Sequence, residues 1–387
     1  MNKECAADFS RSWRVFPLEL ETGLLGPVRA YRREYEPEDA VVTDLPATAQ
    51  AAWLQAGRIP DPYFGSNARD LLWMEQREWW YLKDFDLPET EGRWTLTFAG
   101  VHYRTEVWLN SVQIDMWTGS FLTRRIDLDP GLLLPEGNRL AVRTRAQERA
   151  WEDGTQADPR GFQNSSAHIR TQGPVPQYAY GWNWSPHLVA VGIWRPVRLE
   201  YFKTARFAGP RIQLDLSSDF QSGLARFSGV VERLGSGPGD LRLEMRLKHP
   251  DGRETVRCAS VPAAGEKDSL PVSLEVSLAQ PELWYPNGYG EQPLYRVEVD
   301  LLDGDGKRCD RRTRRAGFRR VEWIRNPGDV ETLEKSGQSN RMWSIVGEPY
   351  PWTLKVNGLR IFSKGSNWCP VDNLYRDRDA HVRRLLE

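Results

Sequence analysis

Short runs of alternating apolar and polar residues recur along the first half of the chain. Three clear examples are RWTLTFAG at 93–100, TEVWLN at 105–110 and RLAVRTRA at 139–146. A period of two predicts half-buried β-strands rather than helices. Turn signals such as Pro130-Gly131 separate the runs at short spacing, which favours an antiparallel sandwich or jelly roll. We expect this first domain to cover residues 1–202.

A second series of strands begins near Lys203. Its apolar runs are RIQLDL, ARFSGVVERL, LRLEMRLKH, VSLEVSL and PLYRVEVDLL, separated by GSGPGD, HPDG and DGDG. Roughly seven short strands with a turn every 8 to 12 positions are typical of an immunoglobulin-like sandwich. We assign this second domain to residues 203–316. Because it contains no cluster of polar residues in an apolar context, we expect it to act as a spacer.

The pattern changes again in residues 317–387. The run WTLKVNGLRIFSKGSNW predicts a β-hairpin with Asn357-Gly358 as its turn, since Asn-Gly is the strongest short hairpin signal. The last residues, DRDAHVRRLLE, space their apolar side chains as in a helix, with Asp377 or Asp379 as the expected N-cap. This third segment therefore combines a hairpin with the beginning of a helix.

The charge balance argues against two classes of partner. The chain has 52 basic and 53 acidic residues among 387 and no long basic run. A surface without excess positive charge does not attract nucleic acid or an anionic membrane. No segment has the apolar run that a signal peptide or a membrane span of about 20 residues needs. We therefore expect a cytoplasmic protein that binds neither nucleic acid nor membrane.

Familiar catalytic and metal-binding motifs do not occur in the sequence. There is no G-x-S-x-G, no H-E-x-x-H, no phosphate-binding loop and no G-x-G-x-x-G before a helix. The 5 histidines are scattered, and His187 is the one with the best claim to a function. The 4 cysteines form no C-x-x-C pair, so we expect reduced thiols, with Cys258 and Cys309 as the one pairing to consider. The sequence therefore predicts neither a metal nor a cofactor.

Tryptophan is the unusual component of the chain. There are 17 Trp, and three of them fall within GWNWSPHLVAVGIWRP at 181–196. Glycine and proline interrupt this stretch too often for an ordinary strand or helix. Aromatic rings pack well on the C–H faces of a sugar, although most tryptophans are core residues. The tryptophans could therefore form either a carbohydrate site or a hydrophobic core, and composition does not distinguish the two.

The motifs around these tryptophans carry a resemblance to a known family. The stretch QYAYGWNWSPHLVAVGIWRP, at 177–196, resembles the signature F-G-W-D-W-G-P followed by G-I-W-R-P of glycoside hydrolase family 2, in its β-mannosidase branch. Further motifs resemble the same family in the same order: IPDPYFGSN at 59–67 with WWYLKDF at 79–85, VHYRTEVWLN at 101–110, LWYPNGYGEQPLY at 283–295 with GFRRVEW at 317–323, and KVNGLRIFSKGSNWCPVD at 355–372. The resemblance covers nearly the whole chain apart from residues near 326–350.

The resemblance implies a mainly β fold in three parts. These are a galactose-binding-like jelly roll that binds sugar, an immunoglobulin-like β-sandwich, and the first strand and helix start of a (β/α)₈ barrel. It also implies a hydrolase that removes a terminal β-linked sugar, with mannose as the configuration of this branch. In that branch the W-D-W loop of the first domain helps to wall the sugar pocket. By position this role falls to Trp182, Asn183 and Trp184, whereas Trp194, on a strand, is better explained as core.

Three positions depart from the pattern of the branch. Asn183 stands in place of the usual Asp, Ser185 in place of the usual Gly, and Ala68 where Glu is common. A neutral amide donates and accepts hydrogen bonds but lacks the charge that makes a hydrogen bond roughly twice as strong. The departures predict an affinity or sugar preference that differs from a typical β-mannosidase.

Three further candidates follow from the resemblance in the third segment. Asn367, Trp368 and Asp372 of NWCPVD fall at the C-terminal end of the first barrel strand, the end where such barrels keep their active sites. There Trp368 would stack on the sugar and Asp372 would accept hydrogen bonds from its hydroxyls. The alternative is that Asp372 caps a turn.

The catalytic residues of the family are two glutamates in the later strands of the barrel, one of them following an Asn. A (β/α)₈ barrel takes about 250 residues, whereas only residues 317–387 are available for it here. No Asn in this chain is followed by Glu. We therefore expect no catalytic residue in this chain.

These observations leave three hypotheses about function. The favoured one is the N-terminal part of a retaining exo-β-glycosidase that resembles β-mannosidase. The second is a non-catalytic carbohydrate-binding protein built from the two sandwiches. In the third, a separate polypeptide completes the barrel. The sugar, its linkage and the oligomeric state stay open.

Overall fold

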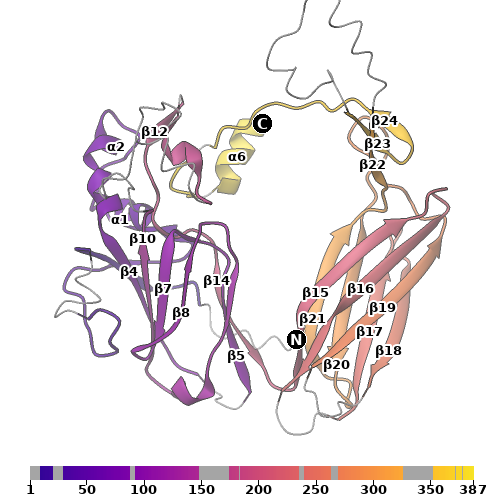
Figure 1. Cartoon of the computed structure of the whole chain (residues 1–387), viewed down its shortest axis with the longest axis horizontal. Helices are drawn as coiled ribbons and strands as arrows, with labels where there is room; N and C mark the ends of the chain where they lie inside the picture. The colour runs from indigo at the N-terminus through magenta and orange to yellow at the C-terminus, as the bar shows by residue number, and fades with distance from the viewer. Residues whose placement is uncertain are drawn as a thin grey trace, which may run out of the picture. The chain divides into compact units, whose positions relative to one another are not determined.

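The computed structural model describes residues 9–20, 29–87, 92–147, 174–182, 184–234, 239–262, 269–325, 352–370, 372–376 and 378–387 (Figure 1). The chain divides into two compact units. The first contains Met1–Tyr201 together with Cys369–Glu387, and the second contains Phe202–Trp368. Each unit has its own hydrophobic core.

The first unit contains a six-stranded antiparallel sheet in the order β2-β1-β4-β10-β7-β8 (Figure 1). The strands are β1 (Trp13–Leu18), β2 (Val41–Thr43), β4 (Glu78–Phe85), β7 (Arg104–Leu109), β8 (Val112–Thr118) and β10 (Asn138–Arg145). The two central strands are β4 and β10, and every residue of β10 is buried.

Both faces of the central strands are covered. In β4, Trp79 and Tyr81 point into the main core, whereas Trp80 and Leu82 belong to a smaller cluster with Trp108. Successive side chains of a strand point to opposite faces of the sheet. All four residues of WWYL can therefore be apolar, because each face of β4 packs against its own apolar cluster.

Two three-stranded sheets accompany the six-stranded sheet in the first unit. One contains β14 (Val197–Phe202), β5 (Arg93–Phe98) and β9 (Arg124–Asp127), and the other contains β3 (Ala47–Thr48), β13 (Gly192–Ile193) and β6 (Val101–His102). Trp94 and Phe98 of β5 share the main core with Val107 of β7 and Val142 of β10. The layers therefore pack face to face through one core, which confirms the sandwich predicted here.

The second unit contains an antiparallel sandwich of one three-stranded and one four-stranded sheet. The first is β15 (Ala205–Leu216), β16 (Ser222–Arg233) and β19 (Ser269–Ala279); the second is β18 (Glu254–Val261), β17 (Leu241–Lys248), β20 (Tyr295–Leu302) and β21 (Arg308–Ala316). Phe207 and Phe227 from one sheet share a core with Met245 and Val299 from the other. The immunoglobulin-like prediction is confirmed. Cys258 and Cys309 are free thiols on β18 and β21, the two edge strands of the four-stranded sheet.

A small antiparallel sheet follows the sandwich in the second unit. It contains β22 (Val321–Arg325), β23 (Trp352–Val356) and β24 (Leu359–Ile361). Asn357 and Gly358 have φ angles of 47° and 83°, as a two-residue hairpin turn requires. The predicted Asn-Gly hairpin is confirmed. Of the residues that lead from this turn to NWCPVD, only Leu359–Ile361 forms a strand.

The last residues end in a helix, as predicted, but they do not share a unit with the hairpin. Helix α6 spans Arg378–Leu386, so Asp379 lies within its first turn, and Asp377 lies outside the described residues. The third segment predicted at 317–387 is split, because the second unit ends at Trp368 and the first unit takes up Cys369–Glu387. In the described ranges, no helix has both the length and the apolar character that crossing a membrane would require.

Candidate functional site

The tryptophan-rich stretch folds as a short hairpin. It begins with the 3₁₀ helix η3 (Gln177–Ala179) and continues as β11 (Tyr180–Trp182) and β12 (Ser185–His187), which pair antiparallel. Gly181 has a φ of 87°, which a glycine adopts without strain. Leu188 closes the loop by donating its N–H to the carbonyl of Ala179 at 2.8 Å. We call η3, β11 and β12, with Trp184 between the strands and Leu188 after them, the aromatic hairpin.

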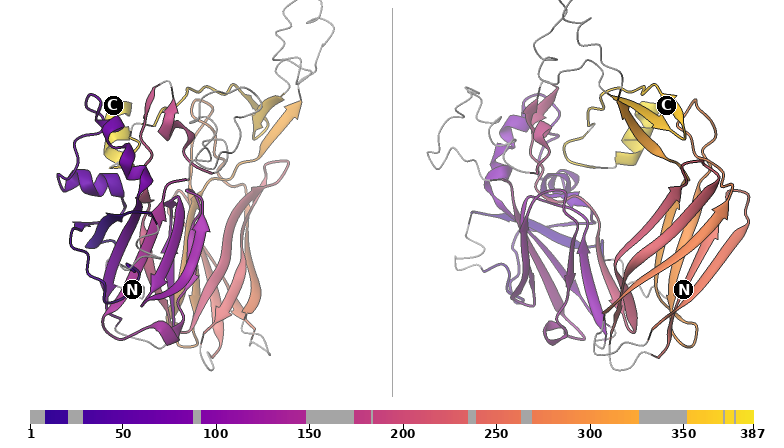
Figure 2. Two further views of the ribbon diagram at one scale, coloured as in Figure 1. Left: turned by 60° about the vertical axis from the view of Figure 1, so that its left-hand side comes forward. Right: turned by 45° about the vertical axis from the view of Figure 1, so that its right-hand side comes forward.

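Short helices lie beside the aromatic hairpin at one end of the first unit (Figure 2). They are α1 (Ala49–Gln55), α2 (Asn67–Asp70) and the 3₁₀ helix η1 (Leu72–Gln76). His187 Nε2 lies 2.9 Å from Glu75 Oε1 of η1, and the Glu75 side chain is buried. Over the residues that the structure describes, no three His, Cys, Asp or Glu side chains are grouped as metal ligands.

Trp184 is the most exposed aromatic ring that the structure describes in the hairpin. It stacks on Tyr178, with ring centroids 5.6 Å apart and an angle of 29° between the planes, and it stays 43% exposed. One face of Trp184 is thus supported and a large part of the ring can be reached from solvent. Asn183 and the side chain of Trp182 lie outside what the structure describes. Trp194, by contrast, is buried and donates Nε1–H to the Ser120 carbonyl at 2.9 Å, as expected of a core residue.

Asp372 is buried and accepts four hydrogen bonds from the protein. Oδ1 accepts from the Tyr63 hydroxyl at 2.7 Å and from Leu374 N–H at 3.0 Å. Oδ2 accepts from Arg376 N–H at 2.9 Å and from Arg376 Nε–H at 3.0 Å. Burial by itself would raise the pKa of Asp372, but these hydrogen bonds outweigh burial and lower the pKa below its ordinary value. Asp372 therefore caps the turn at 372–376, and a direct contact with a sugar stays a prediction.

Tyr63 is a polar partner that the sequence did not single out. Its hydroxyl donates to Asp372 and accepts from Asn373 N–H at 2.6 Å. Burial, followed by the neighbouring charge of Asp372, raises the pKa of Tyr63 well above its ordinary value, so the phenol stays protonated. The one feature of the sequence that could have pointed to Tyr63 is its place within the motif IPDPYFGSN.

Asn373 connects the same turn to the aromatic hairpin. Its Nδ2 donates to Ser185 Oγ at 3.0 Å and to the Leu188 carbonyl at 3.4 Å. Both Asn373 and Ser185 are buried. The structure therefore brings Asp372 and the aromatic hairpin together in one unit.

The other two predicted residues belong to the second unit. Asn367 and Trp368 lie in the irregular run 362–370, and Trp368 is 52% exposed. Their proposed contact with the sugar of the aromatic hairpin stays a prediction.

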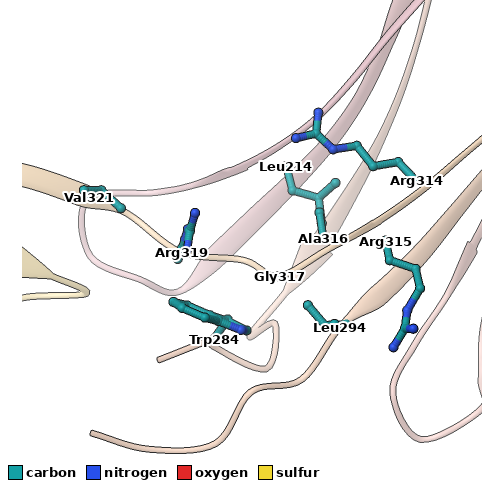
Figure 3. Close-up of a pocket in the computed structure, with 9 residues that line it drawn as sticks. All are labelled: Leu214, Trp284, Leu294, Arg314, Arg315, Ala316, Gly317, Arg319 and Val321. Carbon is teal, nitrogen blue, oxygen red and sulfur yellow. The ribbon is translucent and has the colours of Figure 1, made fainter. Parts of the chain in front are cut away.

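An open hollow lies at one end of the second sandwich (Figure 3). It is lined by Leu214, Trp284, Leu294, Arg314, Arg315, Ala316, Gly317, Arg319 and Val321. The guanidinium carbon of Arg319 lies 4.6 Å from the centroid of the Trp284 ring. Trp284 N–H donates to the Phe318 carbonyl at 2.9 Å, so the motifs LWYPNGYGEQPLY and GFRRVEW meet here. None of the predicted sugar-binding residues lines this hollow.

Comparison with protein families gives two consecutive matches. The model described as the glycosyl hydrolase 2 galactose-binding domain-like family matches residues 31–195. The model described as glycosyl hydrolases family 2 matches residues 205–319. Together the two matches span most of the chain and follow its two sandwiches in order.

Proteins of similar sequence agree with these two family matches. The chain is 29% identical over 355 residues to Beta-mannosidase B of Aspergillus terreus. This match covers 89% of the chain and 38% of that protein. It is 28% identical over 338 residues to Beta-mannosidase B of Thermothelomyces thermophilus, and this match covers 86% of the chain and 36% of that protein. The chain thus spans well under half the length of the relatives that it matches.

Solved structures share the fold at lower identity. Beta-D-mannosidase from Dictyoglomus thermophilum superposes with a TM-score of 0.74 at 24% identity and covers 97% of this chain and 41% of that one. The exo-chitosanase of Amycolatopsis orientalis gives a TM-score of 0.68 at 17% identity, and the superposition covers 97% of this chain and 38% of that one. With the two family matches, the fold and the order of the motifs, the chain belongs to glycoside hydrolase family 2.

Proposed function

We propose that this chain is the N-terminal part of a retaining exo-β-glycosidase resembling β-mannosidase, and that its aromatic hairpin walls the pocket for a terminal β-linked sugar. The observation that carries the proposal is Trp184, which is accessible and supported by Tyr178. An indole face placed in this way suits the apolar C–H face of a pyranose ring. The names of the relatives support a mannose configuration.

Other residues complete the proposed site. The other predicted sugar contacts are Trp182 and Asn183 of the same hairpin and, from the sequence resemblance, Asn367 and Trp368. The catalytic glutamates belong to the portion of the longer relatives that this chain does not span. We also infer a cytoplasmic location and no binding to nucleic acid or membrane, from the sequence arguments alone.

A non-catalytic carbohydrate-binding protein is the second candidate. It is favoured by the fact that the support of Trp184 by Tyr178 lies wholly within the first unit. The coding DNA after Glu387 distinguishes the two candidates. A continuing reading frame that contains an Asn-Glu pair supports the glycosidase, and a frame that stops supports the binding protein.

Calorimetric titration with a mannose-configured inhibitor tests the sugar site. Trp184→Ala should weaken binding about tenfold because the stacking surface is lost. Trp323→Ala is the matched control, since Trp323 is an exposed tryptophan of the second unit. Asn183→Asp should tighten binding about fivefold, because an ionised acceptor makes stronger hydrogen bonds with sugar hydroxyls.

Equal affinity of the wild type and both hairpin variants would show that the aromatic hairpin does not contact the sugar. The chain alone should hydrolyse an aryl β-mannoside no faster than background, because it lacks the family's glutamates. Turnover above background would contradict the assignment of catalysis to another part of the protein.

A further inference from the structure

Three consecutive residues near the end of the chain are buried between exposed neighbours. Asp372, Asn373 and Leu374 are 4%, 3% and 1% exposed, whereas residues 362–369 and 383–387 are exposed. These buried residues belong to the first unit, whereas residues 362–368 belong to the second. We call residues 372–376 the strap.

An apolar contact fixes the middle of the strap. Leu374 packs in a cluster with Ala51 of α1 and Leu188 of the aromatic hairpin. Its carbonyl accepts a hydrogen bond at 3.2 Å from the hydroxyl of Thr48, the N-cap residue of α1. Leu374 thus contacts the helix and the hairpin at the same time.

Polar contacts fix the strap on two sides. On one side, the Tyr63 hydroxyl bonds both Asp372 Oδ1 and Asn373 N–H. On the other side, the Asn373 side chain bonds Ser185 Oγ of β12. A glycine, which the related signature has at position 185, offers no side-chain oxygen for this bond.

The last contact leads to the candidate sugar-binding ring. Tyr375 of the strap has its hydroxyl 3.3 Å from that of Tyr178, and its ring lies 4.9 Å from the ring of Trp194. Tyr178 in turn stacks on Trp184. The strap therefore contacts Tyr178, the residue that supports Trp184.

We propose that Tyr63 and Ser185 are positioning residues, which hold the strap against the aromatic hairpin and thereby fix the orientation of Trp184. The proposal rests on the proposed function for its consequence in sugar binding. Its structural part, the coupling of strap and hairpin, can be measured without any sugar.

Hydrogen–deuterium exchange of the full chain tests the coupling. Tyr63→Phe removes the hydroxyl that bonds Asp372 and Asn373, and Ser185→Ala removes the oxygen that Asn373 bonds. Each variant should speed exchange about tenfold in peptides covering 372–376 and also in peptides covering 177–188, because buried partners lose a hydrogen bond. The melting temperature of the first unit should change little, which separates a positioning role from a general loss of stability.

Two control variants accompany the test. Ser185→Thr keeps the hydroxyl and should keep the slow exchange of the wild type. Tyr285→Phe removes a tyrosine hydroxyl from the second unit, and it should change neither peptide.

Unchanged exchange at 372–376 in both Tyr63→Phe and Ser185→Ala would overturn the proposal. Faster exchange at 372–376 with unchanged exchange at 177–188 would overturn it as well, because the strap would then not hold the hairpin. If the wild type binds no mannose-configured inhibitor while the exchange results are as expected, the proposed function fails and the coupling stands.

Discussion

His102 is a buried polar residue of the first unit whose protonation affects stability. Its side chain is 1% exposed, and its Nδ1 contacts the Ser120 hydroxyl. Burial disfavours the charged imidazolium and lowers the pKa of His102 to about 3. His102 is therefore neutral in the folded protein across the physiological range.

The pKa of His102 predicts a loss of stability in mild acid. In the unfolded chain a histidine has a pKa of about 6.5, so the unfolded state binds a proton below that pH and the folded state does not. Stability is complete above pH 6.5 and falls as the pH drops from there towards about 3. Between pH 7.5 and pH 5.5, His102 should cost the wild type about 1.4 kcal/mol of unfolding free energy.

Urea unfolding at the two pH values measures this cost. His102→Asn has no group that titrates in this range, so its unfolding free energy should fall by about 1.4 kcal/mol less than that of the wild type. An equal fall in both proteins would show that His102 does not carry the effect.

Strand β13 shows how one glycine sets the packing of an element. Gly192 has a φ of 118°, and a Cβ placed on it would lie 2.0 Å from the hydroxyl of Tyr81 and 3.2 Å from the backbone nitrogen of Ala49. Gly209 has a φ of 57° and nothing within 4 Å of such a Cβ. The two glycines therefore separate the effect of close packing from the effect of backbone conformation.

Gly192→Ala should destabilise the protein by about 3 kcal/mol or more, because strain and overpacking act together. Gly209→Ala should cost about 1 kcal/mol, the usual cost of a positive φ for alanine. Denaturant unfolding of both variants checks the difference. Tyr81→Phe in the Gly192→Ala background should recover part of the loss, since the nearest atom is removed. A cost that is the same for both glycines would contradict the close approach of β13 to Tyr81.

At the scale of the whole molecule, the two units have separate cores, and each unit has an arginine paired with a buried carboxylate. In the first unit, Arg143 lies 2.7 Å from Glu78 and 2.9 Å from Glu106, and all three side chains are at most 8% exposed. In the second unit, Arg312 lies 2.6 Å from the buried carboxylate of Asp310.

Separate cores predict two thermal unfolding transitions in a calorimetric scan. Arg143→Met removes the arginine that lies between two buried carboxylates, which should destabilise the first unit by about 3–5 kcal/mol. It should therefore lower one transition and leave the other in place. Arg312→Met is the matched variant, and it should lower the other transition. A single transition that shifts with either variant would show that the units unfold together.

Much of the fold could be predicted because its signals are local. The period of two along residues 93–100 and 139–146 corresponds to β5 and β10, and Asn357-Gly358 forms the expected turn. Gly181 lies within β11 and has the positive φ that favours glycine. The predicted contacts of Asn183 and Asn367 with a sugar stay predictions.

The amino-acid sequence by itself determined which segments become strands, where the Asn-Gly turn falls and which stretch gathers the tryptophans, because each depends on neighbouring residues. Only the tertiary structure decided that Tyr63 meets Asp372, 309 positions away, and that Ser185 meets Asn373, 188 positions away. Periodicity carries no information on such pairs, since contacts between distant segments form only when the whole unit packs. The same packing placed residues 369–387 with the first unit, although they directly follow the second one in sequence.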